Sequence, residues 1–229
     1  FIVRENSFFR TLWIPQWQRY GYFSDTNPAI GRGEIFKEAS ASGMISELNK
    51  PGSFERLQNL SVKYLIIPED SEGEIFLDDR KYSKKVYQET VSGVGKIPWV
   101  NKKTAFGKNV VFEVQNHKDR FWSPNKELSI EYEFINPTKY LIDIRNAKPG
   151  DIIVFSEGFD ENWIANGEEF KIQSSKFEEL LNSFKLPRDG DYSMEIYYEP
   201  QKWVNVGLVI SSLTLISLIL FFARCYKKR

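Results

Sequence analysis

The sequence has very few of the side chains that form disulfides or bind transition metals. Its 229 residues include one cysteine, Cys225, and one histidine, His117. A disulfide needs two cysteines and a structural zinc site needs several cysteines or histidines, so both are excluded within this chain, and no cofactor or metal is expected. His117 lies in a polar stretch that predicts a solvated turn. Calcium sites built from carboxylates alone stay open, although no acidic calcium-binding loop is present.

The sequence also lacks an excess of charge of either sign. It contains 31 basic and 31 acidic residues, and its formal net charge is zero. Proteins that bind nucleic acid through their charge carry a strongly basic surface, so nucleic acid is not expected as a partner. Hydrophobic residues make up 41% of the chain and aromatic residues 15%, which is enough to build a hydrophobic core.

A long apolar segment stands near the C-terminus. No side chain from Trp203 to Ala223 is charged, and about 20 apolar residues in a helix cross the ~30 Å hydrocarbon core of a bilayer. We therefore predict a transmembrane helix over residues 202–224 and a basic tail over 225–229. The alternative, a buried core helix, is seldom so long and so uniformly apolar. The expected membrane-anchor residues are Trp203, Arg224, Lys227, Lys228 and Arg229.

The charges that flank this helix predict its direction in the cell membrane. Short basic segments stay on the cytoplasmic side, and four basic residues follow the helix while one, Lys202, precedes it. We expect a single span in this chain, a cytoplasmic C-terminus and a large extracytoplasmic N-terminal part. No signal-peptide pattern precedes the predicted domains, so upstream transmembrane helices of the same protein are expected to place this part outside.

Residues 1–120 predict an extracytoplasmic α/β lobe. Apolar residues follow helical spacing from Glu34 to Lys50 with an interruption near Gly43, and Ser53 is expected to cap a helix that ends at Leu60. Too few apolar strands are present for a doubly wound nucleotide-binding fold. The further expected elements are a strand at 62–67, a helix at 78–91 and a strand at 110–114.

After Pro124 the apolar residues alternate with polar ones, as they do in half-buried strands. The dipeptides Asn166-Gly167 and Asp189-Gly190 are typical of hairpin turns. This spacing predicts a jelly-roll-like antiparallel β-sandwich over residues 121–201, so the expected fold class is α+β, with an α/β lobe, a β-sandwich and one C-terminal transmembrane helix. Alternation covers residues 128–134, 139–145 and 192–198, and residues 151–155 form a continuous apolar run.

Several motifs are similar to the C-terminal end of one family of membrane enzymes. They are L-Q-N-L-S-V-K-Y-L-I-I-P from Leu57, I-N-P-T-K-Y-L-I-D-I from Ile135, F-S-E-G-F-D-E-N-W from Phe155, N-G-E-E-F-K-I from Asn166, L-P-R-D-G-D-Y from Leu186, and Y-Y-E-P before the apolar helix. In this order they resemble the multi-spanning, GT-C type membrane glycosyltransferases of the YfhO-like kind. The resemblance covers most of the chain.

The resemblance implies that the chain is the accessory extracytoplasmic domain and last transmembrane helix of such an enzyme, which moves a sugar from a polyprenyl-phosphate carrier to a cell-envelope acceptor. The family's acidic catalytic residue lies in an early outer loop that this sequence does not contain, so no catalytic residue is expected here. The implied partners are the lipid bilayer, the polyprenyl-phosphate sugar and a glycan acceptor. The alternative is a non-enzymatic, membrane-anchored carbohydrate-binding or scaffolding module.

Aromatic side chains are candidates for a carbohydrate site, because their faces suit the apolar faces of sugar rings. Packing on the core is the competing role, and Trp163 is expected to be buried inside the sandwich. Asp160 and Glu161 are adjacent carboxylates, whose side chains point apart on a strand or turn, so a solvated surface role is favoured over acid–base catalysis. The candidate carbohydrate-facing residues are Trp13, Trp17, Trp122, Asp160 and Trp163.

Overall fold

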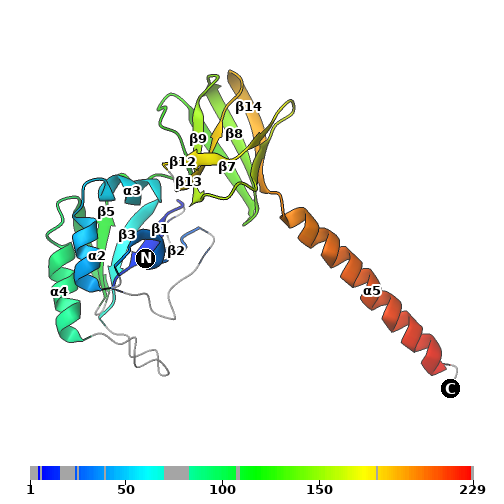
Figure 1. Ribbon diagram of the computed structural model, residues 1–229, viewed down its shortest axis with the longest axis horizontal. Coiled ribbons are helices and arrows are strands. Elements are labelled where there is room, and N and C mark those ends of the chain that lie inside the picture. Colours follow the sequence, from blue (N-terminus) through cyan, green and yellow to red (C-terminus); the bar gives the residue numbers. More distant parts are fainter. Residues whose placement is uncertain are drawn as a thin grey trace. The chain divides into compact units, whose positions relative to one another are not determined.

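A computed structural model describes residues 5, 7–15, 24, 26–38, 40–69, 83–106, 109–178 and 180–227. The chain forms two compact units, which are described separately below (Figure 1). The first unit consists of residues 1–122 together with 154–157, and the second consists of residues 123–153 and 158–229.

A five-stranded mixed sheet forms the centre of the first unit. Its strand order is β2 (Ala29–Ile30), β1 (Arg10–Trp13), β3 (Val62–Ile67), β5 (Asn109–Val114) and β4 (Val100–Phe106). Strand β1 runs parallel to β2 and β3, whereas β5 runs antiparallel to β3 and β4. The predicted strand at 62–67 is confirmed, and it is buried along most of its length because Val, Leu and Ile fill it.

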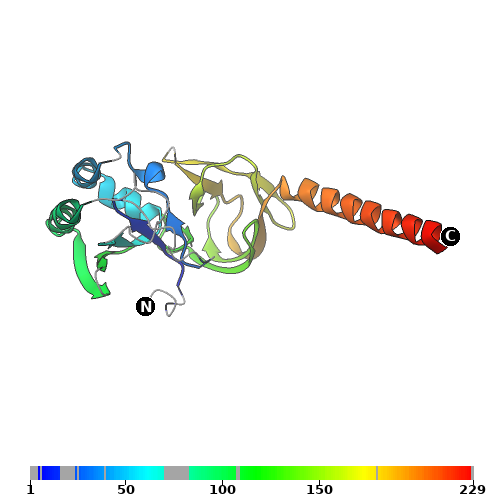
Figure 2. The same cartoon turned by 90° about the horizontal axis from the view of Figure 1, so that it is seen from below.

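The described residues of this unit form four helices: α1 (Arg32–Ile35), α2 (Ala41–Leu48), α3 (Ser53–Asn59) and α4 (Lys84–Val94). Helices α2 and α4 run side by side on one face of the sheet (Figures 1 and 2). Their close approach depends on Gly93, where an added Cβ would come within 2.6 Å of Ile45 Cδ1. A larger residue at position 93 would therefore require the Ile45 side chain to move.

Three details of the predicted helices were wrong. The interruption expected near Gly43 lies earlier, between Ile35 and Ala41, and Gly43 is inside α2. Ser53 does not cap α3, because Gly52 occupies the cap with a φ of 83° and the Ser53 hydroxyl donates to the Glu47 carbonyl at 2.6 Å. Helix α4 begins later than predicted and ends later, and residues 78–82 of the predicted helix lie outside the described residues.

The second unit is an antiparallel β-sandwich, as predicted. Its alternating strands bury one side chain in two, so that Tyr140, Ile142, Ile144, Met194 and Ile196 are all in the core. The five-stranded sheet has the order β11 (Lys171–Gln173), β10 (Trp163–Asn166), β14 (Gly190–Tyr198), β8 (Lys139–Ala147) and β7 (Ser129–Asn136). A four-stranded sheet has the order β12 (Ser175–Phe177), β13 (Leu181–Lys185), β9 (Ile152–Gly158) and β6 (Phe121–Trp122). Strand β6 and residues 154–157 of β9 belong to the first unit.

Neither predicted hairpin turn is a two-residue turn. Strands β10 and β11 stay paired as far as Asn166 and Lys171, and the Gly167 amide donates to the Phe170 carbonyl, so Asn166-Gly167 lies before the turn and not at its centre. Asp189-Gly190 joins β13 to β14, which belong to different sheets. Gly190 has a φ of 91°, a value that favours glycine, and it lies where the chain passes from one sheet to the other. The local sequence does not distinguish such a connection from a hairpin turn.

The C-terminal helix α5 (Gln201–Lys227) confirms the predicted apolar helix and extends it through the first residues of the predicted tail. It is long and apolar enough to cross a membrane, and no residue of its apolar stretch is buried within the protein. Large side chains such as Leu208 and Phe222 are 67% and 64% exposed. An exposed apolar surface of this kind supports a membrane anchor, because lipid covers it at little cost.

A buried arginine organises the polar interior of the first unit. Arg10 is 5% exposed, and its Nη1 donates to the carbonyls of Leu60 at 3.0 Å and Ser156 at 2.5 Å, while Nη2 lies 2.7 Å from Glu157 Oε1. Ser61 donates to Ser156 Oγ at 2.8 Å, so that residues 156 and 157 are held to β1 and the start of β3. A buried charge is tolerated only with such a set of partners.

Replacing this arginine tests how far the first unit depends on it. Arg10→Met keeps the length of the side chain but leaves the carbonyls of Leu60 and Ser156 without their donor, and we expect the free energy of unfolding to fall by about 3 kcal/mol. Arg145→Met is the matched control, because Arg145 is 61% exposed and lies 3.8 Å from Glu131; it should cost less than about 1 kcal/mol. Chemical denaturation of both variants measures this, and equal costs would contradict the assigned role.

Candidate functional site

The candidate aromatic residues of the first unit have separate surroundings. Trp13 in β1 packs against a core cluster that includes Phe9 and Tyr64, and its Nε1 donates to Thr11 Oγ1 at 3.0 Å. Trp122 in β6 is half-buried, with the Lys118 ammonium 5.3 Å from its ring centroid. Trp17 lies outside the described residues. Trp13 therefore contributes to packing, the role that competed with sugar binding.

The structure brings Asp160 and Trp163 together in the loop that leads into β10. The Trp163 amide donates to the Asp160 carbonyl at 3.2 Å. The indole is 8% exposed and lies 6.2 Å from the Tyr140 ring and 5.3 Å from the Tyr198 ring, measured between centroids. The predicted burial of Trp163 is confirmed, and its flat face is a packing surface.

Asp160 fixes this loop to the last strand. Its Oδ1 accepts from the Asn162 amide at 2.9 Å and from Asn162 Nδ2 at 2.8 Å, and its Oδ2 accepts from the Tyr198 hydroxyl at 2.8 Å. The backbone N–H of Asn162 and then the Tyr198 hydroxyl lower the pKa of Asp160 from its ordinary 3.8. Asp160 is therefore ionised at neutral pH and serves as a hydrogen-bond acceptor that positions the loop.

A second carboxylate stands where the sandwich meets α5. Glu199 Oε1 accepts from the ammonium groups of Lys171 and Lys202, each at 3.2 Å, and the Glu199 amide donates to the Asn162 carbonyl at 2.9 Å. The bond from Lys202 lowers the pKa of Glu199 most. This connection from the loop to the helix start was not predicted, because its members lie far apart in the sequence.

His117 is not the solvated turn residue that was predicted. It is half-buried, and its ring lies edge-on to Phe9 with centroids 6.4 Å apart. Burial lowers the pKa of His117, so the imidazole is neutral at physiological pH. Nearby, Glu5 accepts from the Tyr64 hydroxyl at 2.6 Å and from Lys63. Among the described residues, no group of three or more metal-binding side chains comes together.

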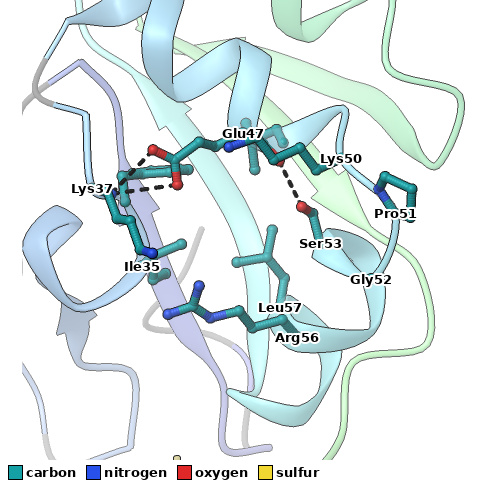
Figure 3. A pocket seen from close by; sticks show the side chains of 11 residues that line it. Ile35, Lys37, Glu47, Lys50, Pro51, Gly52, Ser53, Arg56 and Leu57 are labelled. Carbon is teal, nitrogen blue, oxygen red and sulfur yellow. Dashed lines mark hydrogen bonds between the residues drawn. The ribbon is translucent and has the colours of Figure 1, made fainter.

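A pocket of about 360 Å³ opens in the first unit, between the end of α1, the end of α2 and the start of α3 (Figure 3). Its floor is apolar and buried: Ile35, Phe36, Leu48 and Leu57. Its rim carries Lys37, Lys50, Arg56, Glu47 and Ser53. The sequence offered no signal for this pocket, because its parts come from three short elements without a common motif.

Glu47 is the acidic side chain of this pocket, and the protein backbone already engages it. Its carboxylate accepts from the Lys37 amide at 3.1 and 3.3 Å and from the Glu38 amide at 3.0 Å (Figure 3). The Glu38 N–H is the largest influence that lowers the pKa of Glu47. Glu47 therefore stays ionised and ties the segment after α1 to α2.

Comparison with family models, with curated proteins and with solved structures found no match to this chain. The chemistry of the site is therefore inferred from the chain's own residues.

The bonds to Asp160 predict a specific acid sensitivity. Because its pKa is lower in the folded chain than in the unfolded one, Asp160 contributes stability that is complete above about pH 5 and is lost as the pH falls through 4 toward the folded-state pKa. When the pH is lowered from 6 to 2, the free energy of unfolding of Asp160→Asn should therefore fall by less than that of the wild type, because asparagine has no carboxylate to protonate. Tyr198→Phe, which removes one donor, should lie between them. Thermal melting across this range checks it, and identical curves for wild type and Asp160→Asn would contradict it.

Proposed function

We propose that this chain is the extracytoplasmic accessory domain and last transmembrane helix of a polytopic glycosyltransferase, which transfers a sugar from a polyprenyl-phosphate carrier to a cell-envelope acceptor. The observation that carries the proposal is the direct passage from sandwich to helix. Strand β14 ends at Tyr198 and α5 begins at Gln201. Five of the six motifs that resemble the family lie in this sandwich, each across a connection between two elements, and the last of them leads into α5; the remaining motif, from Leu57, lies in α3 and β3.

In this proposal the short link keeps one end of the sandwich near the bilayer. Three Cα steps lead from Tyr198 to Gln201 and span at most about 11 Å, so the end of β14 would lie close to the point where α5 enters the membrane. Glu199, Lys202 and the loop at 159–162 are at this end and are joined by hydrogen bonds. A lipid-linked sugar is presented at the same level, because its carrier is held in the bilayer. The sandwich would therefore shape the access of the acceptor to the sugar.

An accessory role is favoured over a catalytic one because the carboxylates beside the candidate aromatic residue have structural partners. Both oxygens of Asp160 accept hydrogen bonds, and Glu199 is shared by two lysines. A carboxylate that acts on a glycosidic bond has to reach the sugar as a proton donor or nucleophile. In our proposal the catalytic carboxylate belongs to another part of the membrane enzyme.

Deleting residues 1–200 from the natural gene while keeping α5 tests the function. Under our proposal the cells accumulate the polyprenyl-phosphate sugar, and one sugar disappears from the envelope glycan. Mass spectrometry of the lipid extract and of the glycan measures both. If the shortened protein is present in the membrane and neither quantity changes, the glycosyltransferase proposal is wrong and the non-enzymatic binding module replaces it.

The orientation of α5 gives a separate prediction. Arg224 and Lys227 lie in its last turn, so we expect the C-terminus in the cytoplasm. Cys225 is a free, exposed thiol, and a membrane-impermeant thiol reagent should leave it unlabelled in intact cells and label it in inverted membrane vesicles. Lys126→Cys in a Cys225→Ser background is the matched control, because Lys126 is exposed in the sandwich. It should show the opposite pattern. Labelling of Cys225 in intact cells would contradict the predicted orientation.

A further inference from the structure

We propose that the pocket between α1, α2 and α3 binds a small organic phosphate monoester. This inference concerns the first unit and is independent of the proposed function. The pocket's volume of about 360 Å³ lies within the range of small-molecule sites, roughly 300–1,000 Å³. Such sites combine an apolar lining with a few charged groups that fix one end of the ligand, and this pocket has both.

The charges of the rim select an anion. Lys37, Lys50 and Arg56 are cationic, and Glu47 is the carboxylate among the lining residues. The side chains of Lys37 and Arg56 extend toward the same side of the pocket, below the Glu47 carboxylate (Figure 3). The lining therefore has an excess of two positive charges, which matches the charge of about −1.5 to −2 on a phosphate monoester near neutral pH.

Glu47 reduces this preference without removing it, because its single negative charge stands against three positive ones; its carboxylate oxygens are engaged by the backbone. Its two oxygens accept from the amides of Lys37 and Glu38, at distances from 3.0 to 3.3 Å. These bonds hold the segment that carries Lys37 against α2, so the Lys37 side chain starts from a fixed backbone. A guanidinium and an ammonium that approach one oxyanion give charge-assisted hydrogen bonds, which are about twice as strong as neutral ones.

The floor of the pocket selects the organic part of the ligand. Ile35, Leu48 and Leu57 are 5%, 1% and 1% exposed and line the pocket below the cationic rim. The floor side chains are already buried, but an apolar ring or short chain that lies on them takes its own hydrocarbon surface out of water, which inorganic phosphate cannot do. The ligand therefore carries its phosphate at the rim and an apolar group at the floor.

Isothermal titration of the full chain in nanodiscs with phenyl phosphate tests the assignment. We expect binding, with inorganic phosphate at least about ten-fold weaker, and we expect Lys37→Gln and Arg56→Gln each to weaken phenyl phosphate by about ten-fold. Lys96→Gln is the matched control, since Lys96 is exposed in the same unit and is outside the pocket lining. It should bind as the wild type does.

The proposal is overturned if phenyl phosphate gives no heat at millimolar concentration, or if the Lys37→Gln and Arg56→Gln variants bind it unchanged. Binding of inorganic phosphate as tight as that of phenyl phosphate would overturn the role of the apolar floor. Melting curves show whether each variant is folded. If Arg56→Gln unfolds, Lys37→Gln still decides the question, because the exposed Lys37 side chain can be shortened without loss of core packing.

Discussion

The first unit depends on how the charge of Arg10 is accommodated in its interior. A guanidinium that is taken out of water has to regain its hydrogen bonds inside the protein, and this requirement fixes the carbonyls of Leu60 and Ser156 and the carboxylate of Glu157 around Arg10. Ser61 has a φ of 60°, an unusual value for serine, and its hydroxyl completes this set by donating to Ser156. The segment 154–157 is thereby part of the first unit, although it lies within β9 of the four-stranded sheet.

The second unit satisfies a different constraint, because its last strand passes almost directly into an apolar helix. The polar groups at this passage pair with one another although they are partly exposed to solvent. Glu199 with Lys171 and Lys202, and Asp160 with Tyr198 and Asn162, satisfy each other there. The rings of Tyr140 and Tyr198 lie against Trp163, so this carbohydrate candidate, which was expected to be buried, is a packing residue in the fold.

The pocket of the first unit is built from positions that carry no sequence pattern. Glu47 was unremarkable as one of 31 acidic residues, yet its bonds to two consecutive backbone amides set the wall of the pocket. Gly52, with its φ of 83°, makes the turn that brings α3 and its Arg56 back beside α2. Each of these contributions is a backbone geometry, and side-chain type alone does not reveal it.

The sequence by itself determined the elements whose signal is local. The uncharged run that became α5, the apolar strand β3 and the alternating strands β7, β8 and β14 were predictable, because hydrophobic spacing along a few residues decides which face is buried or meets lipid. Only the tertiary structure decided how Asp189-Gly190 is used, where Arg10 finds its partners, that His117 is half-buried, and that Lys37 and Arg56 share a pocket. These outcomes depend on contacts between residues far apart in the chain, and their energies exist only once the backbone has brought those residues together.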